Sequence, residues 1–144
     1  MQSKPRVILD SSVVVSGIGW RGGDARKVLT LLAIGGFESY RTPWITAEWA
    51  DTVAYVAENE RRWKNPNWIN WLEWLKRASK MAEDISGKKT VKRDPNDDPV
   101  VMAAVAVRAA FIVTTDGDLL DLEKPYGIAC IRPREFLGVI FRQY

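Results

Sequence analysis

Short apolar segments alternate with longer segments of helical spacing along this chain, and this alternation restricts the possible folds more than any other feature. Strands are predicted at 6–10 (RVILD), 37–42, 90–93, 110–115 and 127–131. Helices are predicted at 24–34, 43–59, 68–84 and 99–110, with a helical turn at 118–122 and a last helix from Pro133. The candidate N-caps are Asp24, Thr42 and Asp98. Such alternation predicts a parallel sheet covered on both faces, in a single domain over 1–144.

The residue types that the chain lacks limit the catalytic mechanisms and metal sites that it can have. It has no histidine and one cysteine, Cys130, which excludes Ser-His-Asp and Cys-His catalysis, zinc bound by imidazole, a cysteine metal cage and an internal disulfide. Any catalysis must therefore use carboxylates, hydroxyls, amines or a metal ion. No apolar segment approaches the roughly 20 residues that cross a bilayer. Because no signal-peptide apolar region precedes Asp10, we expect an uncleaved cytoplasmic protein with no membrane association.

Three aspartates lie where a predicted element meets a loop. Asp10 closes the first strand, Asp116 directly follows the strand at 110–115, and Asp98 precedes the helix that begins at Pro99. In open parallel sheets, ligands bind in the crevice outside the carboxyl ends of the strands. If the strands before Asp10 and Asp116 are neighbours, the two carboxylates share that crevice.

Glu48 is different, because it is a charge inside the second predicted helix. With Ile45 three residues before it and Thr52 four residues after it, Glu48 can share the inward edge of that helix. A solvated position on the helix surface is an equally good interpretation. Asp98 can be a simple N-cap and Asp116 part of a turn, so each acid alone carries little information.

Together, these acids need a counter-charge. Carboxylates a few ångströms apart repel one another, so a cluster must take up protons or bind a cation. Mg²⁺ and Mn²⁺ prefer oxygen ligands and often keep several waters. An ion held by two or three carboxylates can activate a water molecule and neutralise charge on a phosphoryl group. The acids therefore indicate a metal site suited to phosphodiester hydrolysis.

Five segments of the sequence resemble those of PIN-domain nucleases. VILDSSVVVSGI (7–18) resembles the opening strand and first acid of that family, and ITAEWADTV (45–53) resembles the helix with the second acid. RDPNDDPVVMAAVAV (93–107) resembles the third motif, an Asp pair before a small-residue helix. IVTTDGDLLDL (112–122) resembles the fourth, a strand that ends in Thr-x-Asp-x-Asp-Leu-Leu. CIRPREFL (130–137) is similar to the final strand and helix of the toxin subgroup of toxin–antitoxin pairs (VapC-like).

The resemblance covers nearly the whole chain, with the motifs in the order of the family. It implies a Rossmann-like three-layer α/β/α fold with a central parallel sheet, and cleavage of single-stranded RNA with Mg²⁺ or Mn²⁺. It also implies a homodimer or higher homo-oligomer and inhibition by an antitoxin protein. Carried over by position, the catalytic acids are Asp10, Glu48, Asp98 and Asp116. The implied metal ligands are Asp10, Asp98, Asp116 and, as a further acid, Asp118, with Asp97 as the alternative to Asp98.

Hydroxyl residues complete the site that the resemblance implies. Family members often have a hydroxyl residue and an asparagine after the first acid, so Ser11 fits and Ser12 departs from the pattern. The Ser12 hydroxyl can still bond a carboxylate. Thr114 or Thr115 can donate to the acids, or both can be ordinary strand residues.

The middle of the chain is basic and rich in tryptophan. Residues 51–93 contain ten Lys and Arg against six acidic residues, whereas 94–144 contain five against eight. The basic residues that could hold RNA are Arg61, Arg62, Lys64, Lys76 and Arg77. The nearby tryptophans, which could stack bases, form an interface or pack in the core, are Trp63, Trp68, Trp71 and Trp74. Because three-residue steps drift around a helix, at least one of the last three is expected to be exposed or covered by another subunit.

These features predict a metal-dependent endoribonuclease, the toxin of a toxin–antitoxin pair. The alternative is a catalytically weak nucleic-acid-binding or regulatory module of the same fold, which Ser12 leaves open. A phosphotransfer receiver domain also clusters aspartates at strand ends. It needs an acceptor Asp at a mid-chain strand tip and a lysine after a later strand, and the sequence has no convincing pair.

Overall fold

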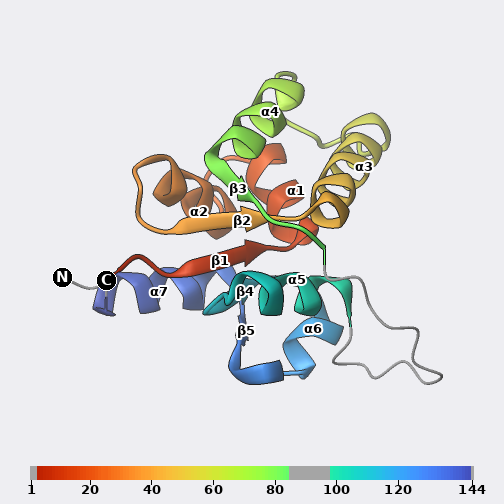
Figure 1. Ribbon diagram of the computed structural model, residues 1–144. Coiled ribbons are helices and arrows are strands. Elements are labelled where there is room, and N and C mark those ends of the chain that lie inside the picture. Colours follow the sequence, from red (N-terminus) through yellow and green to blue (C-terminus); the bar gives the residue numbers. More distant parts are fainter. Residues whose placement is uncertain (1–2, 85–97, 144) are drawn as a thin grey trace.

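A parallel sheet organises the chain in the computed structural model, which describes residues 3–84 and 98–143 (Figure 1). The strands are β1 (Arg6–Leu9), β2 (Glu38–Arg41), β3 (Ser79–Met81), β4 (Phe111–Val113) and β5 (Ala129–Ile131). They form one sheet in the order β3-β2-β1-β4-β5, in which each pair of neighbours is parallel. The predicted α/β fold with a central parallel sheet is confirmed.

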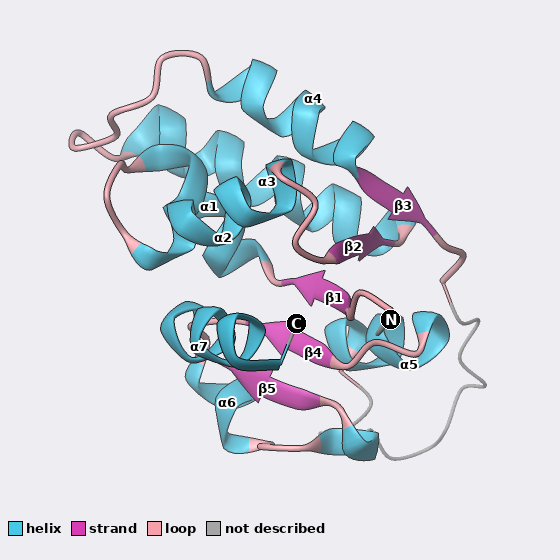
Figure 2. Cartoon of the chain, turned by 90° about the vertical axis from the view of Figure 1, so that its left-hand side faces the viewer, coloured by secondary structure: helices cyan, strands magenta, loops and turns pink. Residues whose placement is uncertain are grey.

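Helices cover the two faces of this sheet. They are α1 (Ser11–Gly19), α2 (Asp24–Ala33), α3 (Pro43–Asn59), α4 (Trp68–Ala78), α5 (Pro99–Val107), α6 (Gly117–Asp121) and α7 (Pro133–Gln143), with a 3₁₀ turn at Pro125–Gly127. Helices α1, α2 and α7 lie on one side of the sheet and α5 lies on the other (Figure 2). This arrangement gives the three layers, α/β/α, that a doubly covered parallel sheet requires.

The core sits at the central strands. Val7, Ile8 and Leu9 of β1 are fully buried, as are Ile112 and Val113 of β4. Such strands have continuous apolar sequence rather than alternation, because both of their faces are covered. On the α7 side, the Phe136 ring packs edge-on against Phe37 and Phe111, with ring centroids 5.1 and 5.5 Å apart.

Three elements, α1, α4 and β3, differ from the sequence prediction. Helix α1 was not predicted, because SSVVVSGIG is rich in β-branched valine and is buried almost all round, which leaves no amphipathic period. Helix α4 ends at Ala78 rather than near 84, and the next three residues form the edge strand β3. There, the buried hydroxyls of Ser39 and Ser79 share a hydrogen bond of 2.7 Å. The strand predicted at 90–93 falls outside the described residues.

The helix caps follow the sequence in two cases out of three. The Thr42 side chain accepts a hydrogen bond from the Ile45 amide, with Pro43 at the first helical position, as predicted. Asp98 caps α5. Helix α2 begins one residue earlier than expected, with Gly23 as its N-cap and Asp24 in its first turn. An acid in the first turn still interacts favourably with the helix dipole.

The far end of α1 is held by side chains from other segments. Arg26 donates hydrogen bonds to the carbonyls of Gly17 and Ile18, and the Asn65 side-chain amide donates to the Ile18 carbonyl at 2.9 Å. These donors satisfy carbonyls that the last turn of a helix leaves without partners. The Arg26 guanidinium also lies 4.1 Å from the centroid of the Trp71 ring. Helix α1 is therefore fixed between α2 and α4.

The tryptophans of the basic middle are all half-buried. Trp63, Trp68, Trp71 and Trp74 pack against the core. In the described chain, none of Trp68, Trp71 and Trp74 is exposed. The expectation that at least one of these rings is exposed is therefore wrong for a single copy of the chain. An indole at the edge of the apolar face of α4 is large enough to reach the core. The gradual rotation of three-residue steps around the helix therefore does not expose it. Coverage by a second subunit stays a prediction. No described helix has the length and apolar character that spanning a membrane requires.

Candidate active site

A crevice of about 520 Å³ lies where β1 and β4 end. Its lining includes all four acids singled out in the sequence: Asp10, Glu48, Asp98 and Asp116. Ser11, Ser12 and Thr115 line it as well. Because β1 and β4 are adjacent in the sheet, the condition for a shared crevice is met. The catalytic role of these acids stays a prediction.

Three of the four acids are N-cap residues. Asp10 precedes α1, Asp98 precedes α5 and Asp116 precedes α6. Asp98 Oδ1 accepts a hydrogen bond of 2.8 Å from the Val100 amide, and Asp116 Oδ1 accepts one of 3.0 Å from the Asp118 amide. The amino end of a helix carries partial positive charge and unpaired N–H groups. The fold therefore stabilises each of these carboxylates locally, although they repel one another.

The Asp10 carboxylate is the most firmly held. Although Asp10 occupies the N-cap position of α1, its side chain makes no capping hydrogen bond to that helix. Instead, its Oδ2 accepts hydrogen bonds of 2.8 Å from both the Ser12 and the Thr114 hydroxyls. The Thr114 hydroxyl in turn accepts from the Asp116 amide at 2.9 Å, and the Ser12 hydroxyl accepts from the Thr115 amide at 3.1 Å. Each hydroxyl thus has its proton directed at Asp10 by the backbone of the facing strand end. Ser12, the departure from the family pattern, positions the first acid.

Glu48 reaches the crevice from α3. Its helix is bound to the end of β1 by the buried indole of Trp49, which donates to the Leu9 carbonyl at 2.8 Å. Thr52, one turn further along, also lines the crevice, and Ile45 is buried beneath. Glu48 is half-buried, so the predicted inward edge of this helix is confirmed and the fully solvated interpretation is wrong.

The donor set fits a hard divalent cation. Asp10, Asp98 and Asp116 each use one carboxylate oxygen in the hydrogen bonds above, and no described residue donates to the second oxygen. Glu48 accepts no hydrogen bond from the described residues, and no described Lys or Arg lines the crevice. As the side chains stand, no three acidic or cysteine side chains among the described residues are close enough to surround one ion. An ion would draw the carboxylates inward or reach some of them through water, as Mg²⁺ commonly does.

Some predicted residues lie outside this crevice. Asp118 is exposed in the first turn of α6 and contributes its amide, rather than its carboxylate, to the contacts of Asp116. Thr114 is fully buried beneath the crevice, and of the two threonines it is the one whose hydroxyl donates to an acid. Thr115 does line the crevice, but its side chain is exposed and donates to no acid among the described residues. Asp97 falls outside the described residues.

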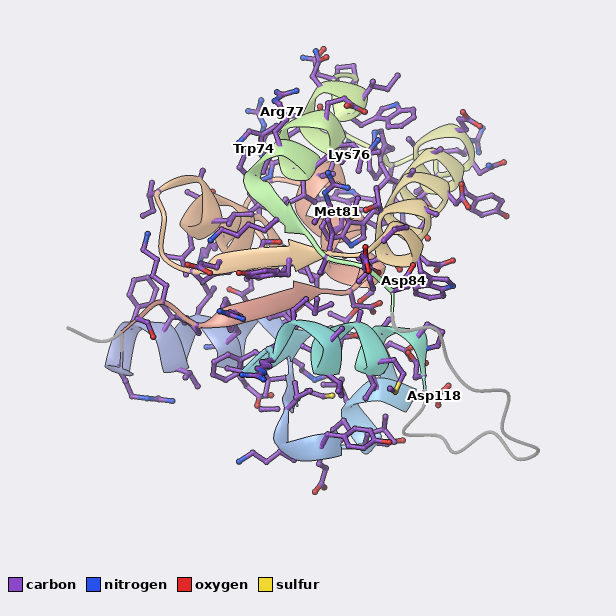
Figure 3. All side chains as sticks on the ribbon, viewed as in Figure 1. Trp74, Lys76, Arg77, Met81, Asp84 and Asp118 are labelled. Atoms are coloured by element: carbon purple, nitrogen blue, oxygen red, sulfur yellow. The ribbon has the colours of Figure 1, made fainter. Side chains whose placement is uncertain are left out.

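The predicted RNA-binding residues are also remote from the acids. Arg61, Arg62 and Lys64 follow the end of α3, a helix of 17 residues that spans about 25 Å from its start at the crevice. Lys76 is paired with Glu73 at 3.0 Å. Figure 3 shows Lys76 and Arg77 on α4, apart from Asp84 and Asp118. These basic side chains can contact only those parts of an RNA strand that extend well beyond the acids.

Sequence reasoning missed one aromatic residue of the crevice. Trp44 lines it together with the acids and is 39% exposed. It lies four residues before Glu48, on the same side of α3. That four-residue spacing was the signal available in the sequence.

The negative charge of Asp98 also acts on a buried thiol of β5. Cys130 of β5 is buried, and burial together with the negative charge of Asp98 raises the pKa of its thiol to about 11. The thiol is therefore protonated at neutral pH and is neither a nucleophile nor a metal ligand in that state.

A parallel sheet with carboxylates gathered where its central strands end defines an α/β protein with an acidic, metal-compatible crevice. The PIN domain family model matches residues 6–118, and the chain belongs to the PIN domain family. Members of this family are generally nucleases, hydrolases that typically depend on divalent metal ions. No curated protein matches the chain.

Proposed function

We propose that the protein is an endoribonuclease that cuts single-stranded RNA with Mg²⁺ or Mn²⁺ and serves as the toxin of a toxin–antitoxin pair, as a homodimer or higher homo-oligomer. The observation that carries the proposal is the convergence of Asp10, Glu48, Asp98 and Asp116 on one crevice without a described basic side chain in its lining. Phosphate cannot approach four carboxylates unless a cation accompanies it. The similarity of the C-terminal segment to the toxin subgroup supports the cellular role.

The hydrogen bonds of each crevice residue indicate a different role for it in the proposed reaction. Asp10, Asp98 and Asp116 would hold the ion through the oxygens that no described residue occupies. Ser12 and Thr114 keep Asp10 oriented toward it. The bound ion supplies Lewis-acid stabilisation of the phosphoryl group and acidifies water. Glu48, free of hydrogen bonds to described residues, accepts the proton of the attacking water at a carboxylate oxygen.

The direct test measures cleavage of single-stranded RNA with Mn²⁺, with EDTA, and by Asp10→Asn. We expect cleavage only by the wild type with metal. Asp51→Asn is the matched control, because Asp51 is an exposed acid of α3 outside the crevice and its variant should cleave normally. Equal cleavage by Asp10→Asn would point to a contaminant or another site. RNA binding without cleavage by the wild type would favour the regulatory module.

The proposed toxin role is tested by a separate experiment on cell growth. Induced expression of the wild type should arrest growth of a host, and Asp10→Asn should not. Growth arrest that persists in the Asp10 variant would separate toxicity from the nuclease.

A further inference from the structure

Trp44 differs from the other six tryptophans of the chain, all of which lie in the described residues. It is the exposed one, at 39%, whereas Trp49 is fully buried and the rest are half-buried. The indoles of Trp20, Trp49 and Trp63 donate to backbone carbonyls. No described ring, cation or hydrogen-bond acceptor contacts the Trp44 indole. Within the described chain, the exposed part of the Trp44 indole is therefore not engaged in any ring stacking, cation–π contact or hydrogen bond.

Trp44 lies beside the acids of the crevice. Residues four apart on a helix have Cβ atoms about 5–6 Å from one another, so the indole is one turn from the Glu48 side chain. Both side chains line the same crevice. A group that rests on the indole is thus adjacent to whatever the four carboxylates engage.

The backbone beneath Trp44 is held at three points. Thr42 caps the Ile45 amide at 3.2 Å, and Pro43 restricts the first helical residue. The Trp44 amide donates a hydrogen bond of 3.0 Å to Asp84 Oδ2, which lies between the end of β3 and the start of α3 (Figure 3). An aromatic ring on a fixed backbone loses little conformational freedom when a flat ligand covers it.

From these observations we propose that Trp44 is a stacking platform for one base of the bound single strand, next to the phosphodiester that is cut. The inference rests on the proposed nuclease function. The acid-lined crevice repels the phosphates of an RNA strand except where a cation accompanies them, so a contact that is indifferent to charge would add affinity near the cut that the carboxylates themselves oppose. Every base has a π-face, and stacking on an aromatic side chain is such a contact. The platform would bind with little sequence preference.

The experiment combines a protein change with a substrate change. Wild type, Trp44→Ala and Trp44→Phe act on a single-stranded RNA oligonucleotide, intact or with one abasic nucleotide placed in turn around the cut. Trp44→Ala should lower kcat/KM for the intact strand about 5- to 150-fold, which corresponds to ~1–3 kcal/mol per stacked base. Trp44→Phe should retain most activity. One abasic position should slow the wild type by a similar factor and leave Trp44→Ala unaffected.

Binding is measured separately in the Asp10→Asn background by titrating the same oligonucleotides, so the result does not depend on turnover. Ile69→Ala is the control, since Ile69 is 58% exposed on α4 and lies outside the crevice. If the wild type does not cleave RNA but abasic-sensitive binding depends on Trp44, the nuclease proposal fails and the platform stands. If the wild type cleaves and Trp44→Ala is within twofold of it at every abasic position, the platform is refuted and the nuclease stands. A change of oligomeric state in both Trp44 variants would also overturn it, because Trp44 would then be an interface residue.

Discussion

Thr114→Val tests whether the hydroxyls around Asp10 hold the crevice together. Thr114 is fully buried, and its hydroxyl donates to Asp10 and accepts from the Asp116 amide. Valine has nearly the same shape, so the substitution removes both hydrogen bonds without opening a cavity. The Ser12 hydroxyl remains on the same carboxylate oxygen, which keeps Asp10 from losing its partners altogether.

The expected loss of stability can be worked out from these contacts. A hydrogen bond to a charged group contributes about 1.5–3 kcal/mol, and leaving an amide without its acceptor costs about 1–3 kcal/mol. The additional buried methyl of valine offsets about 1 kcal/mol. The net loss of unfolding free energy is therefore about 1.5–5 kcal/mol, or roughly 5–15 °C in Tm at about 3 °C per kcal/mol for a chain of this size.

Thermal and urea unfolding of the two threonine variants measures this directly. Thr115→Val is the matched control: Thr115 is the next residue, is exposed, and uses its amide rather than its hydroxyl in the contacts of the site. It should unfold like the wild type. If the nuclease proposal holds, Thr114→Val should also lower activity about 10- to 100-fold, as changes to groups that orient metal ligands do.

Two results would refute this reasoning. Equal stability of Thr114→Val and the wild type would show that the hydroxyl contacts contribute nothing net. An equal loss in both variants would show that the effect comes from valine at the end of β4 and not from Asp10.

Two further predictions concern charge. Asp116→Asn should raise Tm in EDTA and abolish stabilisation by Mn²⁺, because Asn keeps the cap to the Asp118 amide while it removes one repelling charge; a lower Tm in EDTA would make the carboxylate itself structural. The free energy of unfolding should fall between pH 9.0 and about 11, because the thiol of Cys130 ionises in the unfolded chain before it does in the folded one. That contribution, on the order of 3 kcal/mol for two pKa units, is complete below pH 9 and should be missing from the pH profile of Cys130→Ala.

Much of the fold was predictable because strong local signals agree with the tertiary structure. The apolar run before Asp10 becomes the central strand, and the Thr42-Pro43 pair begins α3 where expected. The sequence could not indicate α1, since a helix buried almost all round has no polar face to set its period. Nor could it indicate β3, whose short and mostly exposed segment gains its strand character only by pairing with β2.

The candidate site was predictable to the level of which strands end in acids. Parallel strands place their carboxyl ends along one edge, so the convergence of Asp10 and Asp116 follows from topology. The choice between Thr114 and Thr115 did not follow, because both faces of β4 are covered and an apolar run does not show which way each side chain points. The same limit applies to Asp118, since its place in the first turn of α6 depends on where that helix begins.

The coincidence of acids with helix caps bears on how such a protein can lose its activity. Asparagine serves as well as aspartate in an N-cap. At Asp98 and Asp116, an exchange of one oxygen for nitrogen would leave both helix starts intact and remove a charge from the crevice. A catalytically inactive relative of this chain could therefore arise by single substitutions that leave the fold unchanged. It would still present the same surface to any protein that recognises the active form.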